Sequence, residues 1–445
     1  MNRNNLRRKL TDDAKCKSET RTSTIGPQSE DWITVYERVH THAFGTPLRV
    51  MDHGKGMRVW DVDGNEYLDF LAGIAVNSLG YAHPKWVSAL RDQAGKVAHV
   101  SNYFASVPQI ELAEKLLEIA GAPGGSRVYF ANSGAEANEA AIKMARLYGR
   151  SLAEDNAENS EQTVRIIALT QAFHGRTMGA LSATWKPSIR ESFEPLLPAV
   201  EFVEAGDLSA LGAAFDKEND KNAGPVAAVM VELIQGEAGV RPLDPEYVKG
   251  VRRLCDEYRA LLIVDEVQTG IGRTGQWFAF QRDDLSGGIN PDIITFAKGV
   301  AGGFPMGGMI AFGKPLASLF SHGLHGSTFA GGPLAASAGL ATLRTIEEEK
   351  LLGNAEDRGQ QLRKAVISCG NPLFVSVRGR GLLDAIELSH PCAHAAMEWA
   401  LDHGLIVNAV ARDALRLAPP LIASAADVRE AVSILSRVPV DLPDD

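Results

Sequence analysis

Short apolar runs alternate with helical repeats through the middle of the chain. Five runs are rich in aliphatic side chains and show no polar alternation: residues 127–130, 164–170, 226–234, 260–267 and 292–296. Between them, apolar residues recur at helical spacing, as across residues 137–148. Strands that are apolar on both faces occur in parallel sheets that helices cover on both sides. The sequence therefore predicts an α/β domain with a mostly parallel sheet.

The two ends of the chain do not follow this pattern. Residues 58–70 contain two short strand-like runs joined by a turn at Asp63, Gly64 and Asn65. After about residue 334, a long helical stretch comes before further short elements, which are strands at 375–388, 405–410 and 415–417 and a helix at 393–403. This arrangement predicts a smaller α+β unit at the C-terminal end.

The first 30 residues contain few large apolar side chains and lack the hydrophobic stretch of a secretory signal. Four basic residues come before any acid, which is the charge pattern of an organelle transit peptide. Acidic residues follow closely from Asp12 onward, however. We therefore interpret residues 1–30 as a disordered tail.

Composition and charge exclude several classes of protein. Lys and Arg number 45 against 55 Asp and Glu, which leaves a net charge of −10 and no long basic run. No apolar run approaches the roughly 18 residues of a membrane span. The four cysteines are far apart, and histidine pairs near residues 322–325 and 390–394 lack a third ligand. We predict a cytoplasmic protein that acts on small molecules, with no metal site and no nucleic-acid or membrane partner.

One candidate anion site follows the run that ends at Phe130. Residues 132–138 open the next predicted helix, and free backbone N–H groups with the positive end of the helix dipole favour a phosphate there. Gly134 allows close approach, and the Ser133 hydroxyl can donate a hydrogen bond. A simple helix N-cap is the alternative interpretation.

Three other strand ends have chemically active side chains. Phe173 can stack on a planar ligand, and Arg176 can form paired hydrogen bonds to a carboxylate. Asp265 ends a very apolar run, where a buried carboxylate needs a positive partner. Lys298 ends another run, where loss of solvent makes the amine a better nucleophile. Each alone has a simpler explanation: a loop phenylalanine and histidine (His174) that only pack, an acid that caps a turn, and a solvated lysine.

Together, these features match the requirements of pyridoxal 5'-phosphate. This cofactor needs a phosphate cradle, a ring-stacking aromatic, an acid for the ring nitrogen and a lysine that bonds to it. A competing motif, GxGxxG at residues 270–275, suggests an NAD-dependent dehydrogenase, but no clear helix follows it. A non-catalytic binding protein is a third alternative, which the presence of both Asp265 and Lys298 disfavours.

The chain resembles the class III, fold type I, pyridoxal-phosphate-dependent aminotransferases from about residue 44 to residue 421. Several long motifs in the same order support the resemblance, at residues 132–138, 173–177, 235–237, 265–275, 297–299, 325–329 and 415–420. It implies a large cofactor-binding domain at residues 81–333 and a small domain at residues 334–445. Residues 31–80 would pack with the small domain.

The resemblance implies a role for each cofactor-site residue. Lys298 bonds to the cofactor and then shuttles a proton, Asp265 pairs with the ring nitrogen, and Gln268 hydrogen-bonds near the ring hydroxyl. Phe173 and Val267 enclose the ring. The phosphate is held by Ser133, Gly134 and Ala135 and, from the neighbouring subunit, by Thr328. The resemblance therefore implies a homodimer with shared active sites.

It also implies how the substrates bind. Arg176 would clamp the substrate α-carboxylate with Ser327 nearby, and Arg416 would bind a carboxylate of 2-oxoglutarate. Glu237 would pair with Arg416 and mask its charge when the amino donor is bound. The implied reaction transfers the terminal amino group of N2-acetyl-L-ornithine, an acylated diamino acid, to 2-oxoglutarate, as in arginine biosynthesis.

The choice of amino donor is the part of this interpretation with most alternatives. Family members that use free ornithine have two tyrosines where this sequence has Phe44 and Ile74, neither of which offers a hydroxyl. This favours an acylated donor. Succinyldiaminopimelate, succinylornithine and acetyl-lysine stay open beside acetylornithine, and free ornithine and 4-aminobutyrate are further rivals. Trp185, near the expected substrate loop, could belong to the pocket or to the packing.

Overall fold

The computed structural model describes residues 25–154, 164–217 and 224–445. Most of the predicted tail, residues 1–30, therefore lies outside the described residues. Helix α2 begins at Pro27, so the last residues of the predicted tail are helical. The described chain forms two compact units, one of residues 25–52 with 60–65 and one of residues 53–59 with 66–445. The predicted domain limits at residues 80 and 333 stay a prediction.

The first unit contains helix α2 (Pro27–Val39) and the short helix η1 (His42–Phe44). The Asp63 carboxylate accepts hydrogen bonds from the backbone N–H groups of Gln28 and Ser29, at 2.9 and 3.0 Å. A carboxylate at this end satisfies free N–H groups in the first turn of α2 and complements the helix dipole. The turn that contains Asp63 thus holds the start of α2.

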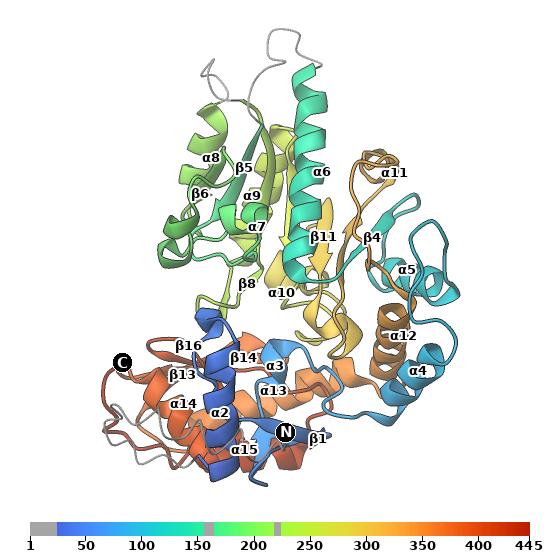
Figure 1. Ribbon diagram of the computed structural model, residues 1–445. Coiled ribbons are helices and arrows are strands. Elements are labelled where there is room, and N and C mark those ends of the chain that lie inside the picture. The colour runs from blue at the N-terminus through green and yellow to red at the C-terminus, as the bar shows by residue number, and fades with distance from the viewer. Residues whose placement is uncertain (1–24, 155–163, 218–223) are drawn as a thin grey trace. The chain divides into compact units, whose positions relative to one another are not determined.

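A seven-stranded sheet forms the centre of the second unit (Figure 1). Neighbouring strands, in spatial order, are β4 (Arg127–Ala131), β12 (Gly307–Ala311), β11 (Ile293–Phe296), β10 (Leu261–Asp265), β7 (Val226–Val231), β5 (Arg165–Leu169) and β6 (Val200–Val203). From β11 to β6 all pairs are parallel, and β12 runs antiparallel to both of its neighbours. The predicted mostly parallel sheet is confirmed.

Helices bury both faces of this sheet. Ile263 on β10 packs in one apolar cluster with the face of α6 (Gly134–Glu154). Its neighbours Leu262 and Val264 pack in the other cluster, with α8 (Leu208–Asp216) and α9 (Pro245–Glu257). Successive side chains of a strand point to opposite faces, so burial on both faces requires the unbroken apolar runs of the sequence. Among the described residues, no helix is long and apolar enough to cross a membrane.

A second, antiparallel sheet lies toward the C-terminal end. Its strands, in spatial order, are β13 (Phe374–Arg380), β14 (Leu383–Leu388), β17 (Ala414–Leu417) and β16 (Asn408–Ala411). Helices α13 (Leu351–Ser368), α14 (Ala393–Asp402) and α15 (Ala425–Leu435) accompany it. The short strand β15 (Leu405–Ile406) pairs in parallel with β3 (Glu66–Asp69). The predicted α+β part is confirmed, which completes the predicted fold class.

The remaining elements are strands of two to five residues and helices of up to 16 residues. The strands predicted within residues 58–70 are present as β2 and β3. The further bounds are β1 (Met51–Lys55), β2 (Arg58–Asp61), β8 (Ile234–Gln235), β9 (Arg241–Pro242), α3 (Ala72–Ala75), α4 (Pro84–Ala94), α5 (Val107–Ile119), α7 (Met178–Ser182), α10 (Asp283–Ser286), α11 (Lys314–Ala317), α12 (Pro333–Glu348), η2 (Pro187–Ile189), η3 (Glu191–Phe193), η5 (Ala279–Gln281) and η6 (Lys298–Ala301).

The central sheet supplies a stability prediction. Ile263 is fully buried beneath α6, so we expect Ile263→Ala to leave a cavity and to lower the free energy of unfolding by about 2–5 kcal/mol. Ile367→Ala is the matched control, because Ile367 on α13 is 54% exposed. Urea unfolding of both variants checks this. Equal losses in the two variants would contradict the assigned burial.

Candidate active site

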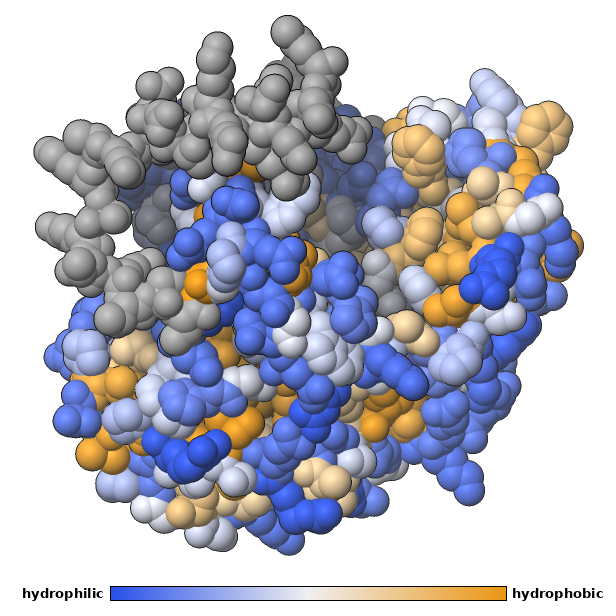
Figure 2. Space-filling view, turned by 60° about the horizontal axis from the view of Figure 1, so that its bottom comes forward, coloured by the Kyte–Doolittle hydropathy of each residue, from blue (hydrophilic) through white to orange (hydrophobic). Residues whose placement is uncertain are grey.

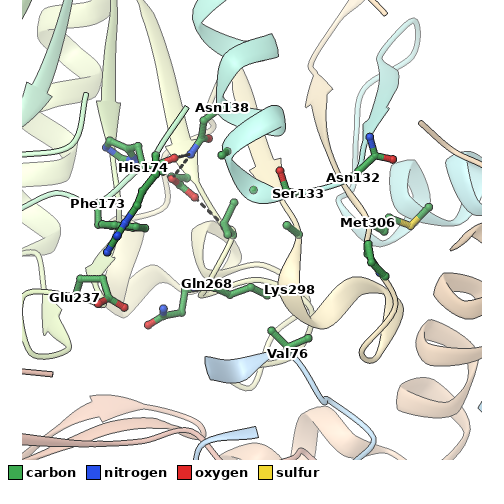
Figure 3. Close-up of a pocket in the computed structure, with 18 of the residues that line it drawn as sticks. Val76, Asn132, Ser133, Asn138, Phe173, His174, Glu237, Gln268, Lys298 and Met306 are labelled. Atoms are coloured by element: carbon green, nitrogen blue, oxygen red, sulfur yellow. Dashed lines mark hydrogen bonds and ion pairs between the residues drawn. The ribbon is translucent and has the colours of Figure 1, made fainter. Parts of the chain in front are cut away.

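A cavity of about 500 Å³ lies where the parallel strands end and α6 begins (Figure 3). In the close-up, Phe173, Glu237 and Gln268 lie to one side of Lys298, and Asn132 and Met306 lie to the other. Carboxyl ends of parallel strands are the usual ligand edge of an open α/β sheet. The predicted site residues that line the cavity are Ser133, Gly134, Ala135, Phe173, Arg176, Glu237, Asp265, Val267, Gln268 and Lys298.

The start of α6 closes one end of the cavity. The Ser133 carbonyl accepts from Ala137 N–H, and the Ser133 hydroxyl accepts from Glu136 N–H at 3.2 Å. Ser133 therefore caps α6, and Gly134 and Ala135 of its first turn line the cavity. A Cβ at position 134 would lie 2.6 Å from Val267 Cγ1. Glycine is needed there for close approach, and the free amides favour an anion.

The Asp265 carboxylate sits in a network of three donors. Its Oδ2 is 2.7 Å from His174 Nδ1 and accepts from Asn138 Nδ2 at 2.8 Å. Its Oδ1 accepts from Val267 N–H at 2.9 Å. Burial opposes protonation of His174, but the hydrogen bond and charge of Asp265 outweigh it and raise the pKa of His174. Among the three donors to Asp265, His174 is therefore the one that can carry a positive charge.

Lys298 stands two residues after the end of β11, at the start of η6, and lines the cavity. Burial, followed by the nearby charge of Arg416, lowers the pKa of its amine to about 8, against the pull of Glu237 and Asp265. Its backbone φ is +42°, a left-handed conformation that costs a residue with a Cβ roughly 1–2 kcal/mol. A strained residue with a shifted pKa in a cavity marks a reactive centre.

The two arginines have different surroundings. Arg416 on β17 is 1% exposed and is not part of the cavity lining. Its guanidinium donates to Glu237 Oε1 at 2.6 Å, to Gln268 Oε1 at 3.2 Å and to Asn408 Oδ1 at 2.7 Å. Arg176 lines the cavity and is exposed. One cation is thus already paired with a carboxylate, and the other faces solvent.

Burial would raise the pKa of Glu237, but the charge and hydrogen bond of Arg416 outweigh it and lower that pKa. The pair is therefore ionised at neutral pH, and a bound carboxylate could replace Glu237 on Arg416.

Ser327 and Thr328 are outside the cavity lining. The Ser327 hydroxyl accepts from Asn132 Nδ2 at 2.8 Å, which ties its loop to the residue before the phosphate motif. Thr328 is exposed. Its predicted contact with the phosphate of a neighbouring subunit stays a prediction.

The sequence interpretation missed Asn138 and Glu232, which both line the cavity, and left His174 undecided. Asn138 stands one helical turn after Gly134, so helical spacing could have placed it on the same face. Glu232 follows directly after the buried strand β7, and Asp265 is the last residue of the buried strand β10. An acid at the end of a buried strand was therefore a signal in the sequence that could have indicated Glu232. Trp185 contacts Phe202 with ring centroids 5.1 Å apart and does not line the cavity, so it belongs to the packing.

The competing glycine motif at residues 270–275 is a buried structural loop. The Arg273 guanidinium within it donates to the carbonyls of Leu382 and Pro419. The next regular element is the short η5, and no helix starts at the motif. A dinucleotide fingerprint needs a tight turn from strand to helix, so the dehydrogenase alternative is wrong.

The residues of the cavity fit pyridoxal phosphate. The first-turn amides of α6 suit its phosphate, and the ring space lies beside Phe173 and Val267. Asp265 has its orientation set by three donors and presents an anion to a ring nitrogen. The lowered pKa of Lys298 keeps part of the amine neutral and able to react with an aldehyde.

Fold and site together define a pyridoxal-phosphate enzyme, and the comparisons identify its family. The family model described as Aminotransferase class-III matches residues 40–438. The chain belongs to the class III aminotransferases, which depend on pyridoxal phosphate. It is 68% identical to the acetylornithine aminotransferase of Bifidobacterium longum, over 95% of this chain and 98% of that one. It is 46% identical to that of Streptomyces coelicolor, over 85% and 88% of the two chains.

Solved structures agree with this assignment. The ornithine aminotransferase of Toxoplasma gondii superposes with a TM-score of 0.83 at 31% identity, over 97% of each chain. The acetylornithine aminotransferase of Elizabethkingia anophelis superposes with a TM-score of 0.78 at 32% identity, over 92% of this chain and 98% of that one. Two related activities therefore share this fold, so the fold alone does not choose the amino donor.

The lowered pKa of Lys298 predicts a pH effect on the apoprotein. Between pH 8 and the ordinary lysine pKa, the folded state binds fewer protons than the unfolded state, so stability rises with pH. We expect a gain of about 2 kcal/mol from pH 8 to pH 10 that Lys298→Met lacks. Urea unfolding at both pH values measures it. The control is Lys364→Met at an exposed position of α13, and parallel curves for the wild type and Lys298→Met would contradict the shift.

Proposed function

We propose that the protein transfers the terminal amino group of N2-acetyl-L-ornithine to 2-oxoglutarate, in arginine biosynthesis. The products are N-acetyl-L-glutamate 5-semialdehyde and glutamate. The observation that carries the proposal is the Lys298 amine in one cavity with the Asp265 network and two arginines at its edge. The 68% identity to an acetylornithine aminotransferase supports the choice of donor.

Pyridoxal phosphate, when bound, supplies an aldehyde for the amino group and a ring that withdraws electrons from the carbon that loses its proton. Asp265 keeps the ring nitrogen protonated through opposite charge, and His174 and Asn138 hold the carboxylate in place for this. Lys298 Nζ would hold the aldehyde group of the cofactor. Its amine, part of which is neutral near pH 8, would move the proton at the carbon next to the donor nitrogen.

The arginines allow one cavity to accept two substrates. Arg176 is free to bind the α-carboxylate of the donor through paired hydrogen bonds. The Glu237–Arg416 pair presents no net charge to an acylated donor. With 2-oxoglutarate, the second carboxylate takes the place of Glu237 on Arg416. Ser327, close to Asn132 at the cavity wall, lies near the bound donor.

We infer an acylated donor from two positions at which this chain has no side-chain hydroxyl. By the resemblance, Phe44 and Ile74 stand where family members that use free ornithine have tyrosines, and neither side chain has a hydroxyl. An acylamino group has no charge to satisfy. The reducing cytoplasm is the compartment that we propose, because the described Cys255, Cys369 and Cys392 are free thiols.

A substrate panel tests this function. With 2-oxoglutarate as acceptor, we expect kcat/KM for N2-acetylornithine to exceed that for free ornithine by about tenfold or more, the worth of one unpaired polar group. Succinylornithine, succinyldiaminopimelate, acetyl-lysine and 4-aminobutyrate complete the panel. Lys298→Ala is the control and should lose the activity and also the visible absorption, which in the wild type borohydride removes when it fixes the cofactor on the lysine. A preference for free ornithine would contradict the argument from Phe44 and Ile74.

We also propose that two copies form a homodimer with shared active sites. Phe329 is exposed, and so are five large apolar side chains within residues 97–110, which are Val97, Tyr103, Phe104, Val107 and Ile110. Hydrophobic side chains gather on the right of the face in Figure 2, the side where Figure 1 places α4 and α5. Such a patch is typical of an interface.

The patch adjoins the loop with Thr328. His99 and Phe329 have ring centroids 5.1 Å apart, and Asn102 donates to the carbonyl of Ser327. A second copy on this patch would therefore place its own active site beside the exposed Thr328.

Phe104→Asp tests the dimer. A charge in a buried apolar interface is costly, so we expect the dimer dissociation constant to rise about 30-fold or more in sedimentation experiments. Cofactor affinity should fall with it, because Thr328 would no longer reach the partner's phosphate. Ile367→Asp changes an equally apolar exposed residue on α13 and should leave the dimer intact. A wild-type monomer would refute the proposal.

A further inference from the structure

The hairpin that contains Glu237 has little regular structure of its own. Its strands β8 and β9 have two residues each and pair through Ile234 with Pro242 and Gln235 with Arg241. So short a pair is too weak to hold its loop in one place. Side chains from outside the hairpin therefore determine where Glu237 lies.

Glu232 ties this hairpin to the cofactor side of the cavity, as does Gln235, whose Nε2 donates to the Thr170 carbonyl at 2.8 Å. Its Oε1 accepts from the backbone N–H of Phe173 at 2.8 Å, and its Oε2 accepts from the backbone N–H of Gly236 at 3.2 Å. Phe173 is the predicted stacking residue, and Gly236 precedes Glu237. The Glu232 carboxylate thus links the backbone of Phe173, beside the ring space, to the backbone of the hairpin.

The position of Glu232 is costly. Its side chain is 6% exposed and lines the cavity, and its partners are backbone amides instead of a lysine or arginine. Burial raises its pKa to about 7, although the charge of His174 opposes this. A buried carboxyl without a cation in contact destabilises a fold, so a role in holding the site accounts for its presence.

Gly236 directly precedes Glu237, which forms the ion pair with Arg416. A Cβ at position 236 would lie 2.1 Å from Gln268 Oε1, which is an acceptor for Arg416. Glu237, the next residue, is the other cavity acceptor for Arg416, at 2.6 Å. A shift of the Gly236 amide would therefore move Glu237 and free space around Gln268 together.

We propose that Glu232 is a positioning residue that holds Glu237 on Arg416 and so sets the balance between amino donor and keto acid. The proposal rests on the proposed function, in which Glu237 masks Arg416 for the donor and leaves it for 2-oxoglutarate. With Glu232 in place, the hairpin favours the masked state. Loss of one of its two hydrogen bonds favours the unmasked state, in which the charge of Arg416 is available to a dicarboxylate.

Glu232→Gln is the test, because an amide keeps the size but can accept from only one of the two N–H groups. We expect KM for the amino donor to rise about fivefold, the effect of one lost hydrogen bond, while KM for 2-oxoglutarate stays constant or falls. A purely structural defect would raise both constants or lower kcat alone. Equal change in both constants, or change in neither, overturns the proposal.

Glu266→Gln is the matched control. Glu266 is also buried just after a strand, accepts from the Phe280 backbone N–H at 2.8 Å and has a pKa raised by burial to about 7. It has no bond to the hairpin, so its variant should leave the ratio of the two KM values unchanged. The same shift of the ratio in this control would overturn the proposal.

Two further measurements separate this proposal from the function on which it rests. In the apoprotein, hydrogen exchange of the amides in residues 233–243 should be faster in Glu232→Gln than in the wild type or in Glu266→Gln. Unchanged exchange overturns the role of Glu232 in holding the hairpin.

Glu237→Gln alone should shift the ratio of the two KM values, and adding Glu232→Gln should shift that ratio no further. If Glu237→Gln has no effect, the proposed masking fails even where the exchange result holds.

If Glu232→Gln does not fold, Glu232→Asp replaces it, since the shorter side chain keeps the charge but cannot reach both amides. The same split between the two KM values is then required, and its absence refutes the role of Glu232.

Discussion

The buried carboxylate of Asp265 is the constraint on which the rest of the site depends. It ends β10, whose other four residues are buried and apolar, so its charge must be met by donors from other elements. His174 comes from the loop after β5, Asn138 from α6, and Val267 from the chain just beyond the strand. The carboxylate thereby joins three segments that are distant in sequence at the edge where a cofactor ring fits.

Close packing around this carboxylate allows few other residues in the cradle. Gly134 approaches Val267 so closely that a methyl group would clash, and the helix that it begins supplies both the first-turn residues at the cavity wall and Asn138. The same helix buries one face of the central sheet with its apolar side. A single helix therefore stabilises the sheet and orients the charge network, and the site cannot shift without a change in the core.

Sequence reasoning located most of the site but not its internal contacts. Lys298, Asp265 and Phe173 could be found because each follows an apolar run, where a polar or aromatic residue stands out. His174 could not be assigned, since a histidine in a loop has the same local pattern whether it faces solvent or a buried acid. Glu232 was missed although it stands at the end of a buried strand, because the sequence does not show that its partners are the backbone amides of Phe173 and Gly236.

The sequence by itself determined the α/β class and the α+β part that follows the parallel strands, and it indicated residues able to bind a phosphate, a ring and an amine. It did so because burial on both faces of a strand and helical periodicity are local patterns. Only the tertiary structure decided that Arg416 is already paired with Glu237, that Thr328 is exposed, and that the Gly270–Gly275 loop is buried packing. Those facts depend on tertiary contacts between segments that are distant in sequence, because such contacts determine which charges pair and which residues are buried.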